Sequence, residues 1–216
     1  MDGFEQLGAS TGTLQALALA LGLGWASGLR LYATVAVLGI LSFTGTIELP
    51  PGLAPIAHPW VIGVAAFMFL AEFLADKIPG VDSLWDATQT FVRIPAGLLL
   101  AWAAVSGEGS SIDPVLQVLA ALAGGSLAAG THFAKAGARA LINTSPEPFS
   151  NWGASIGEDA LVLTGLWLCL QHPLLFLLAL VLFVGLLAWA LPRLARGIGV
   201  MFTRLAAFVD RANRPN

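Results

Sequence analysis

The chain has 216 residues, of which 57% are hydrophobic and only 11% are charged. Soluble domains carry about 25% charged residues, so less than half of the usual charge is present here. Ten Lys and Arg against thirteen Asp and Glu leave no basic excess, and the lone Cys169 supplies neither a disulfide framework nor a thiolate metal site. These numbers exclude a soluble globular enzyme, a disordered chain and a nucleic-acid-binding protein.

Apolar stretches long enough to cross a bilayer, which takes about 20 residues, follow one another along the chain. The first stretch, 12–45, would make a helix of about 51 Å, too long for one crossing. Gly24, Gly28 and Arg30 interrupt it, so we predict two short spans that meet at a tight glycine-rich turn, with a re-entrant pair as the alternative. The predicted spans are 12–27, 29–45, 59–78, 82–106, 114–142, 150–170 and 173–192.

The fold class that these spans predict is an all-α polytopic bundle of six to seven transmembrane helices, some of them broken. We expect one transmembrane domain over 1–192. The strings Ser83-Leu-Trp-Asp-Ala and Ser150-Asn-Trp-Gly-Ala open two of its spans. This weak similarity suggests parallel hairpin repeats over 59–106 and 114–170.

The C-terminal segment 193–216 is predicted to be a basic amphipathic helix that lies on the inner membrane surface. Its apolar residues recur at helical spacing and its arginines fall outside that series. A simple stop-transfer anchor is the alternative. The apolar residues are Leu194, Ile198, Met201, Leu205 and Phe208.

The basic residues are distributed unevenly between the two ends of the predicted spans. If the N-terminus is periplasmic, the external segments are 1–11, 46–58, 107–113 and 171–172, and none of them contains Lys or Arg. Because cytoplasmic flanks carry the Lys and Arg of membrane proteins, this asymmetry predicts a periplasmic N-terminus and a cytoplasmic C-terminus. The expected location is a bacterial inner membrane.

Several ionisable residues fall inside the predicted spans, where each charge costs about 2.5 to 3.5 kcal/mol at the bilayer centre. Helical spacing places them on shared faces, so we expect them to line a hydrated, cytoplasm-facing cavity. The predicted ion or substrate pathway consists of Arg93, His132, Lys135, Arg139, Asn151, Ser155, Glu158 and Asp159. A secondary polar group nearer the turns consists of Arg30, Glu72, Asp76, Lys77, Asp82 and Asp86.

Structural roles are the alternative for some of these residues. Asp82 is well placed to cap a helix N-terminus. Arg93 could form one buried ion pair with Glu158 or Asp159 that fixes the helix register.

Three strings resemble a family of bacterial integral membrane proteins, the domain of unknown function 4126. They are Ala26-Ser-Gly-Leu-Arg-Leu-Tyr32, the run from Glu72 to Asp86, and Asn143-Thr-Ser-Pro-Glu-Pro-Phe-Ser-Asn-Trp152 with Glu158-Asp159. The likeness extends from about Leu14 to Arg196. The resemblance implies a multi-pass inner-membrane protein and carries no known activity with it.

Three functions are compatible with these features. The first is a transporter or channel for a small ion or charged solute, in which Gly24, Gly28 and Pro95 mark helix breaks. The second is a metal-dependent lipid-phosphate enzyme, in which Asp82 and Asp86 share a divalent cation. The third is a membrane scaffold whose small residues Gly130, Ala134 and Ala138 pack against a partner.

A transporter is favoured, because ionisable groups inside a membrane usually mark ion or solute pathways. We expect no cofactor. The expected partners are the lipid bilayer and a small ion or charged solute, without nucleic acid. Association into a homo-oligomer is open.

Overall fold

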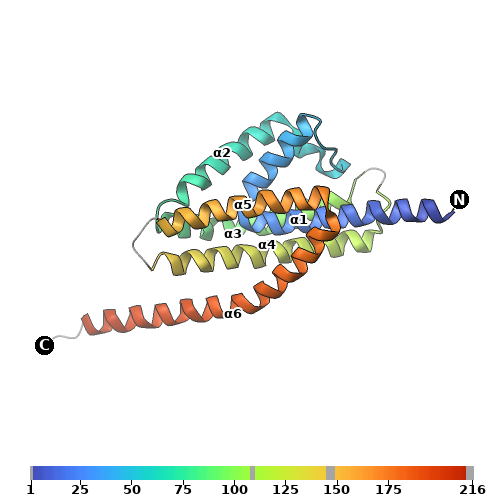
Figure 1. The fold of residues 1–216 in the computed structure, drawn as a ribbon. Helices are drawn as coiled ribbons and strands as arrows, with labels where there is room; N and C mark the ends of the chain where they lie inside the picture. The colour runs from blue at the N-terminus through green and yellow to red at the C-terminus, as the bar shows by residue number, and fades with distance from the viewer. Residues whose placement is uncertain (1, 108–109, 145–148, 213–216) are drawn as a thin grey trace.

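The computed structural model describes residues 2–107, 110–144 and 149–212, with side chains placed between 12 and 200 in these ranges and at Thr203. All of the regular structure in this part is helical (Figure 1). The elements are α1 (Asp2–Phe43), the short 3₁₀ helix η1 (Pro51–Ala57), α2 (Pro59–Ala75), α3 (Val81–Val105), α4 (Pro114–Ile142), α5 (Phe149–Gln171) and α6 (Pro173–Ala212).

The predicted fold class, a multi-span helical bundle, is confirmed. Within the described residues, five helices are long and apolar enough to cross a membrane. The bent pair of η1 and α2 makes a sixth candidate, with 67° between its two helices. The sequence predicts seven spans because it treats 12–27 and 29–45 as separate spans. In the structure both belong to α1, and we call the parts before and after its break the first and second arms.

Helix α1 is broken, but at a different residue from the predicted one. Arg30 has φ −145° and ψ 68°, which is not helical, whereas the stretch from Gly24 to Gly28 is regular helix. The break therefore comes two residues after the predicted turn.

The two glycines before the break serve close helix packing instead of a turn. A Cβ added to Gly24 would overlap the backbone of Gly124 in α4. A Cβ added to Gly28 would overlap the Thr131 hydroxyl and the Ala128 carbonyl of the same helix. Small residues at this spacing let two helix backbones approach within a membrane. The spacing of Gly24 and Gly28 therefore seats the first arm of α1 against α4.

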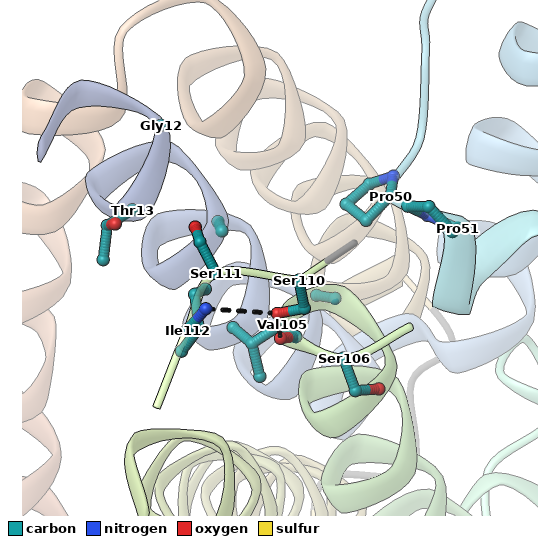
Figure 2. A pocket seen from close by; sticks show the side chains of 11 residues that line it. Gly12, Thr13, Pro50, Pro51, Val105, Ser106, Ser110, Ser111 and Ile112 are labelled. Carbon is teal, nitrogen blue, oxygen red and sulfur yellow. Dashed lines mark hydrogen bonds between the residues drawn. The ribbon is translucent and has the colours of Figure 1, made fainter. Parts of the chain in front are cut away.

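The two arms of α1 begin and end at the same end of the bundle. A pocket there is lined by Gly12 and Thr13 from the start of α1 and by Pro50 and Pro51 from the segment after it (Figure 2). Ser110 follows α3 and lines the same pocket. The chain thus enters the bundle, turns at Arg30 and returns, a course that the predicted pair of short spans and the re-entrant alternative share.

Each of the remaining connections between helices lies at one of the two ends of the bundle. His172, before α6, lines a second pocket with Leu14 of α1, so it shares the end that holds Gly12 and Pro50, here called the N-terminal end. At the other end, Asn143 after α4 donates a hydrogen bond to Asp82 of α3. The last turns of α6 lie towards this second end, here called the C-terminal end (Figure 1).

Helix α6 runs without interruption through the predicted boundary at 192/193. Pro192 lies inside it, and the helix continues to Ala212. Leu194 and Ile198 pack close to Gly137 of α4, so this part of the predicted surface helix is attached to the bundle. The side chains of Met201, Arg204, Leu205, Phe208 and Arg211 lie outside the described ones, as do residues 213–216. An interfacial position for the tail stays a prediction.

The arrangement of burial fits a bundle surrounded by lipid. The first arm of α1 lies at the centre, with Ala18, Leu23 and Ala26 fully buried. Large apolar side chains point outward from the peripheral helices, as Phe67 does on α2 and Leu182 on α6. Because lipid tails are as apolar as leucine, such exposed faces are stable only in a membrane.

Candidate functional site

Nine ionisable side chains meet around the break in α1. They come from α1, α2 and its C-cap, α3, α4 and α5, and every one is within 4 Å of an oppositely charged member. We call this set the charge cluster. Its members are Arg30, Glu72, Asp76, Asp86, Arg93, Lys135, Arg139, Glu158 and Asp159.

The charge cluster lies within the apolar length of the helices, towards the C-terminal end. At 1.5 Å per residue, Arg93 is about 18 Å along α3 from Val81, and Glu158 is about 14 Å along α5 from Phe149. Seven of its nine side chains are fully buried, whereas those of Glu158 and Asp159 are 15% and 19% exposed. The predicted wet cavity is therefore a packed set of charges with one accessible edge at α5.

The cations of the cluster satisfy backbone groups that the break in α1 leaves free. The last carbonyls of a helix have no partner inside it, and cations near them are stabilising. Lys135 donates to the carbonyl of Leu29 at 3.3 Å, and Arg93 donates to that of Gly28 at 3.5 Å. The broken end of the first arm is thus held by side chains of α3 and α4.

Arg30 connects the predicted ion or substrate pathway with the predicted secondary polar group. Its guanidinium lies 3.1 Å from Glu72 Oε1 and also contacts Asp76 Oδ2. On α5 it lies 3.2 Å from Glu158 Oε2 and 2.8 Å from Asp159 Oδ1. The residue predicted to belong to the secondary polar group is therefore the one that joins α2 to α5.

Glu72 is the carboxylate most closely surrounded by cations. Its Oε1 lies 2.5 Å from Arg93, 3.0 Å from Lys135 and 3.1 Å from Arg30. One carboxylate oxygen of α2 is thus shared by cations from α1, α3 and α4. Breaking such a buried group by removing one member is strongly destabilising.

Arg139 and Glu158 form a bidentate pair between α4 and α5. Arg139 donates from Nε and Nη2 to the two oxygens of Glu158, at 3.2 and 3.1 Å. The same guanidinium donates to the carbonyl of Asn151 at 3.1 Å. Ser155 also belongs here, since its hydroxyl accepts from Arg30 at 2.8 Å. Two parallel hydrogen bonds add geometric specificity to the charge attraction.

The ion pairs of Arg93 are not those that the sequence suggested. Arg93 pairs with Glu72 and with Asp86, at 2.5 and 3.1 Å. Glu158 and Asp159, its predicted partners, pair with arginines of α1 and α4 instead. The reason is the second half of α1, which turns at Arg30 and inserts that guanidinium beside α5.

His132 is held as a neutral group next to the cluster. Its Nδ1 lies 3.3 Å from Arg93 Nη1, and its Nε2 lies 2.7 Å from the Thr90 hydroxyl. Because a guanidinium only donates, Nδ1 must accept and Nε2 must carry the proton. The Thr90 hydroxyl then accepts from Nε2 and donates its own hydrogen bond to the backbone carbonyl of Asp86 at 3.2 Å.

Two residues of the predicted secondary polar group stand apart from the cluster. Asp82 Oδ1 accepts hydrogen bonds from the Gly80 and Ser83 amides and from Asn143, at 2.9, 2.6 and 2.7 Å. It stabilises the start of α3 from within the first turn, whereas the N-cap itself, the position that the structural alternative gave to Asp82, is Gly80. Lys77 donates to the Phe73 carbonyl at 3.2 Å and lies over that residue's ring.

The carboxylates of Asp82 and Asp86 form hydrogen bonds and ion pairs with different groups of the protein. One oxygen of Asp82 binds amide groups, while Asp86 Oδ1 pairs with Arg93 and Lys135 at 3.1 and 3.5 Å. Within the described ranges, no group of three or more His, Cys, Asp or Glu side chains is placed to hold a metal ion.

Sequence reasoning overlooked three uncharged residues that support the site. Tyr32 donates its hydroxyl proton to Gln89 Oε1 at 2.7 Å, beside the arginine at the break. Gln89 and Thr90 lie one turn from Asp86 and from Arg93 on α3, which is the spacing that could have revealed them.

Together, the apolar helices, the broken α1 and its ionised interior define a multi-span helical integral membrane protein. The model of the family described as Domain of unknown function (DUF4126) matches residues 17–193, and the chain belongs to that family. The resemblance predicted from the sequence is confirmed. Neither a curated protein nor a solved structure matches the chain.

Proposed function

We propose that the protein is a transporter or channel for a small ion or charged solute, with the charge cluster in its pathway. The observation that carries the proposal is the meeting of nine ionisable side chains at a helix break within the membrane-spanning length. Broken helices of this kind bind ions in transporters, because their free ends present carbonyl and amide groups.

The density of charge supports a pathway more than a purely structural role. Each buried ion is costly to desolvate, and apolar side chains of similar volume stabilise a fold as well or better. One ion pair would be enough to fix the register of two helices, whereas here nine groups form one continuous set. Ionisable groups that face a bundle interior mark ion and proton pathways by default.

The attachment of α2 suggests which element moves. Glu72 is fully buried and holds α2 to the cations of three other helices. Most of the rest of α2 is partly exposed, with Ala65 and Ala75 as further buried residues. Because Glu72 joins α2 to three cations, α2 can exchange these ion pairs for contacts with a passing ion.

The proposed orientation follows from the distribution of basic residues. We place the C-terminal end of the bundle in the cytoplasm and the N-terminal end in the periplasm of a bacterial inner membrane, according to the positive-inside rule. Glu158 and Asp159 are then the edge of the cluster that an ion reaches first from the cytoplasmic half.

Flux of protons, Na⁺, K⁺ and Cl⁻ into proteoliposomes tests the proposal. The informative set is Glu158→Gln, Arg139→Gln and the double variant, which neutralises a bidentate pair. The control is Asp113→Asn: Asp113 is exposed and caps α4 through the Val115 amide at 2.8 Å, and Asn caps equally well.

A pathway predicts that the folded double variant has lost flux while Asp113→Asn retains it. If the cluster only joins helices, as in the scaffold alternative, the wild type has no flux above empty vesicles for any of the four ions. The scaffold alternative uses Gly130 to pack against a partner protein. In the structure Gly130 packs against Leu187 of α6, inside the bundle.

A further inference from the structure

The charge cluster contains one more carboxylate than it has cations. Glu72, Asp76, Asp86, Glu158 and Asp159 face only Arg30, Arg93, Lys135 and Arg139, while His132 is neutral. A net charge in the low-dielectric interior is costly, so the surplus carboxylate favours taking up a positive charge.

The ion pairs show which carboxylate is the surplus one. Within the described residues, Glu72, Asp76 and Glu158 each lie within 4 Å of three cations. Asp86 lies near two cations. Among the described residues, Asp159 has one cation within 4 Å, Arg30 at 2.8 Å, and this contact lacks hydrogen-bond geometry. Asp159 is therefore the least compensated of the five.

Hydrogen bonding shows the same excess of negative charge. Among the described residues, four buried carboxylate oxygens of the cluster have no hydrogen-bond partner, against two guanidinium nitrogens. Three of the four belong to side chains that are fully buried. The oxygens are Glu72 Oε2, Asp76 Oδ1, Asp86 Oδ2 and Asp159 Oδ1.

Asp159 is also the cluster member whose side chain is most exposed. Its side chain is 19% exposed, while Arg30 beside it is fully buried. Lys77 is a nearby cation outside the cluster, and its ammonium lies over the Phe73 ring. The charged groups that act on Asp159 are Arg30 of α1, Glu72 and Asp76 of α2 and its C-cap, Lys77 of the following turn, and Glu158 of α5.

We infer that Asp159 binds and releases a proton, and that this proton neutralises the charge cluster. Uptake converts the carboxylate into a carboxylic acid and leaves four carboxylates opposite four cations. Release restores the surplus charge beside Arg30, at the point where α1 breaks. The part of the inference that makes this proton the coupling or transported ion rests on the proposed function, whereas the titration itself does not.

Infrared spectroscopy of the purified protein in lipid nanodiscs, titrated from acidic to alkaline pH, tests the inference. The wild type should show a protonated-carboxyl band that disappears as the pH rises. Because the other carboxyl groups of the chain absorb in the same region, the signal of Asp159 is the component of this band that Asp159→Asn lacks and Asp113→Asn keeps. An unchanged band in Asp159→Asn would overturn the inference, as would a wild-type midpoint that follows the Na⁺ or K⁺ concentration, because the site would then bind a metal cation.

Two further variants keep the test decisive if Asp159→Asn does not fold. Asp159→Glu should retain the band at a changed midpoint. Lys77→Gln should move the midpoint to higher pH, because a neighbouring cation is lost. Midpoints equal to that of the wild type in both variants would contradict the assignment to Asp159.

Flux measurements on the same samples separate this inference from the proposed function. A band assigned to Asp159 without any flux would leave the proton site standing and remove the transporter. Flux that persists together with an unaltered band in Asp159→Asn would remove the proton site and leave the transporter.

Discussion

The two ends of the bundle differ in how they use space and charge. Around the break in α1, nine ionisable groups are packed against one another, and most are fully buried. At the N-terminal end, a pocket of about 360 Å³ is lined by uncharged side chains, among them Thr13, Pro50 and Ser110 (Figure 2). One region is characterised by buried charges, and the other by a pocket with uncharged walls.

This difference indicates where the chemistry of the protein lies. A pocket with hydroxyl groups alone has little to attract an ion selectively, however large it is. Ionised side chains in an apolar medium are maintained only when they compensate one another, so their position is specified far more strictly. The charge cluster should therefore be sensitive to substitution, and the pocket tolerant of it.

The largest effect is expected from neutralising Glu72. Glu72→Gln leaves three cations short of their shared carboxylate, which should lower the free energy of unfolding by about 3–5 kcal/mol. Reversible unfolding in mixed micelles measures this loss. Glu48→Gln removes an exposed carboxylate at the N-terminal end and should change little. Equal losses of unfolding free energy in the two variants would contradict the predicted difference between the two ends of the bundle.

A smaller but clear effect is expected where α1 packs on α4. Gly28→Val would push a side chain into the Thr131 hydroxyl and the Ala128 carbonyl, and overpacking of this kind lowers stability by about 1–3 kcal/mol. Gly63→Val is the matched control, because a Cβ at Gly63 meets nothing within 4 Å. Thermal unfolding in detergent compares them, and a tolerated Gly28→Val would show that the two helices are not in close contact.

Loss of the Asp82 carboxylate in the first turn of α3 should have a moderate effect on stability and little effect on ion flux. Asp82→Ala removes the acceptor for the Gly80 and Ser83 amides, which should lower stability by about 0.5–2 kcal/mol. Asp82→Asn, which keeps an acceptor oxygen, should recover most of this. A folded Asp82→Ala variant that has lost all flux would place Asp82 in the pathway after all.

The smallest effect is expected in the pocket of Figure 2. Ser110 donates to the Val105 carbonyl at 2.8 Å and accepts from the Ile112 amide at 3.3 Å. Ser110→Ala should therefore cost about 0.5–1.5 kcal/mol and leave flux at the wild-type level. Abolished flux in a stable Ser110→Ala protein would move the functional site to the N-terminal end.

Much of the fold could be predicted because a bilayer imposes simple constraints on sequence. The spans follow from apolar length, and the charged residues could be expected inside the bundle because lipid does not solvate them. The break in α1 could be predicted only in part. Gly24 and Gly28 are compatible with a tight turn and also with close helix packing, and the local sequence does not distinguish these two structures.

The pairing of charges could not be predicted because it depends on how the helices are placed. The sequence places Arg30 in the secondary polar group, because only the turn of α1 at its break brings Arg30 next to Asp159 on α5. Spacing on α3 correctly put Asp86 and Arg93 on one face. It could not show that Glu72 of α2 completes their set.

The claim that the members of the charge cluster stabilise one another is tested most directly by a double-mutant cycle on Glu72 and Arg93. Free energies of unfolding are measured for the wild type, Glu72→Gln, Arg93→Gln and the double variant. Because Glu72 Oε1 and Arg93 Nη2 lie 2.5 Å apart in the buried set, the double variant should be less destabilised than the sum of the two single changes by about 1–3 kcal/mol. Additivity within about 0.3–0.5 kcal/mol would show that the two residues do not interact, and would contradict the cluster itself.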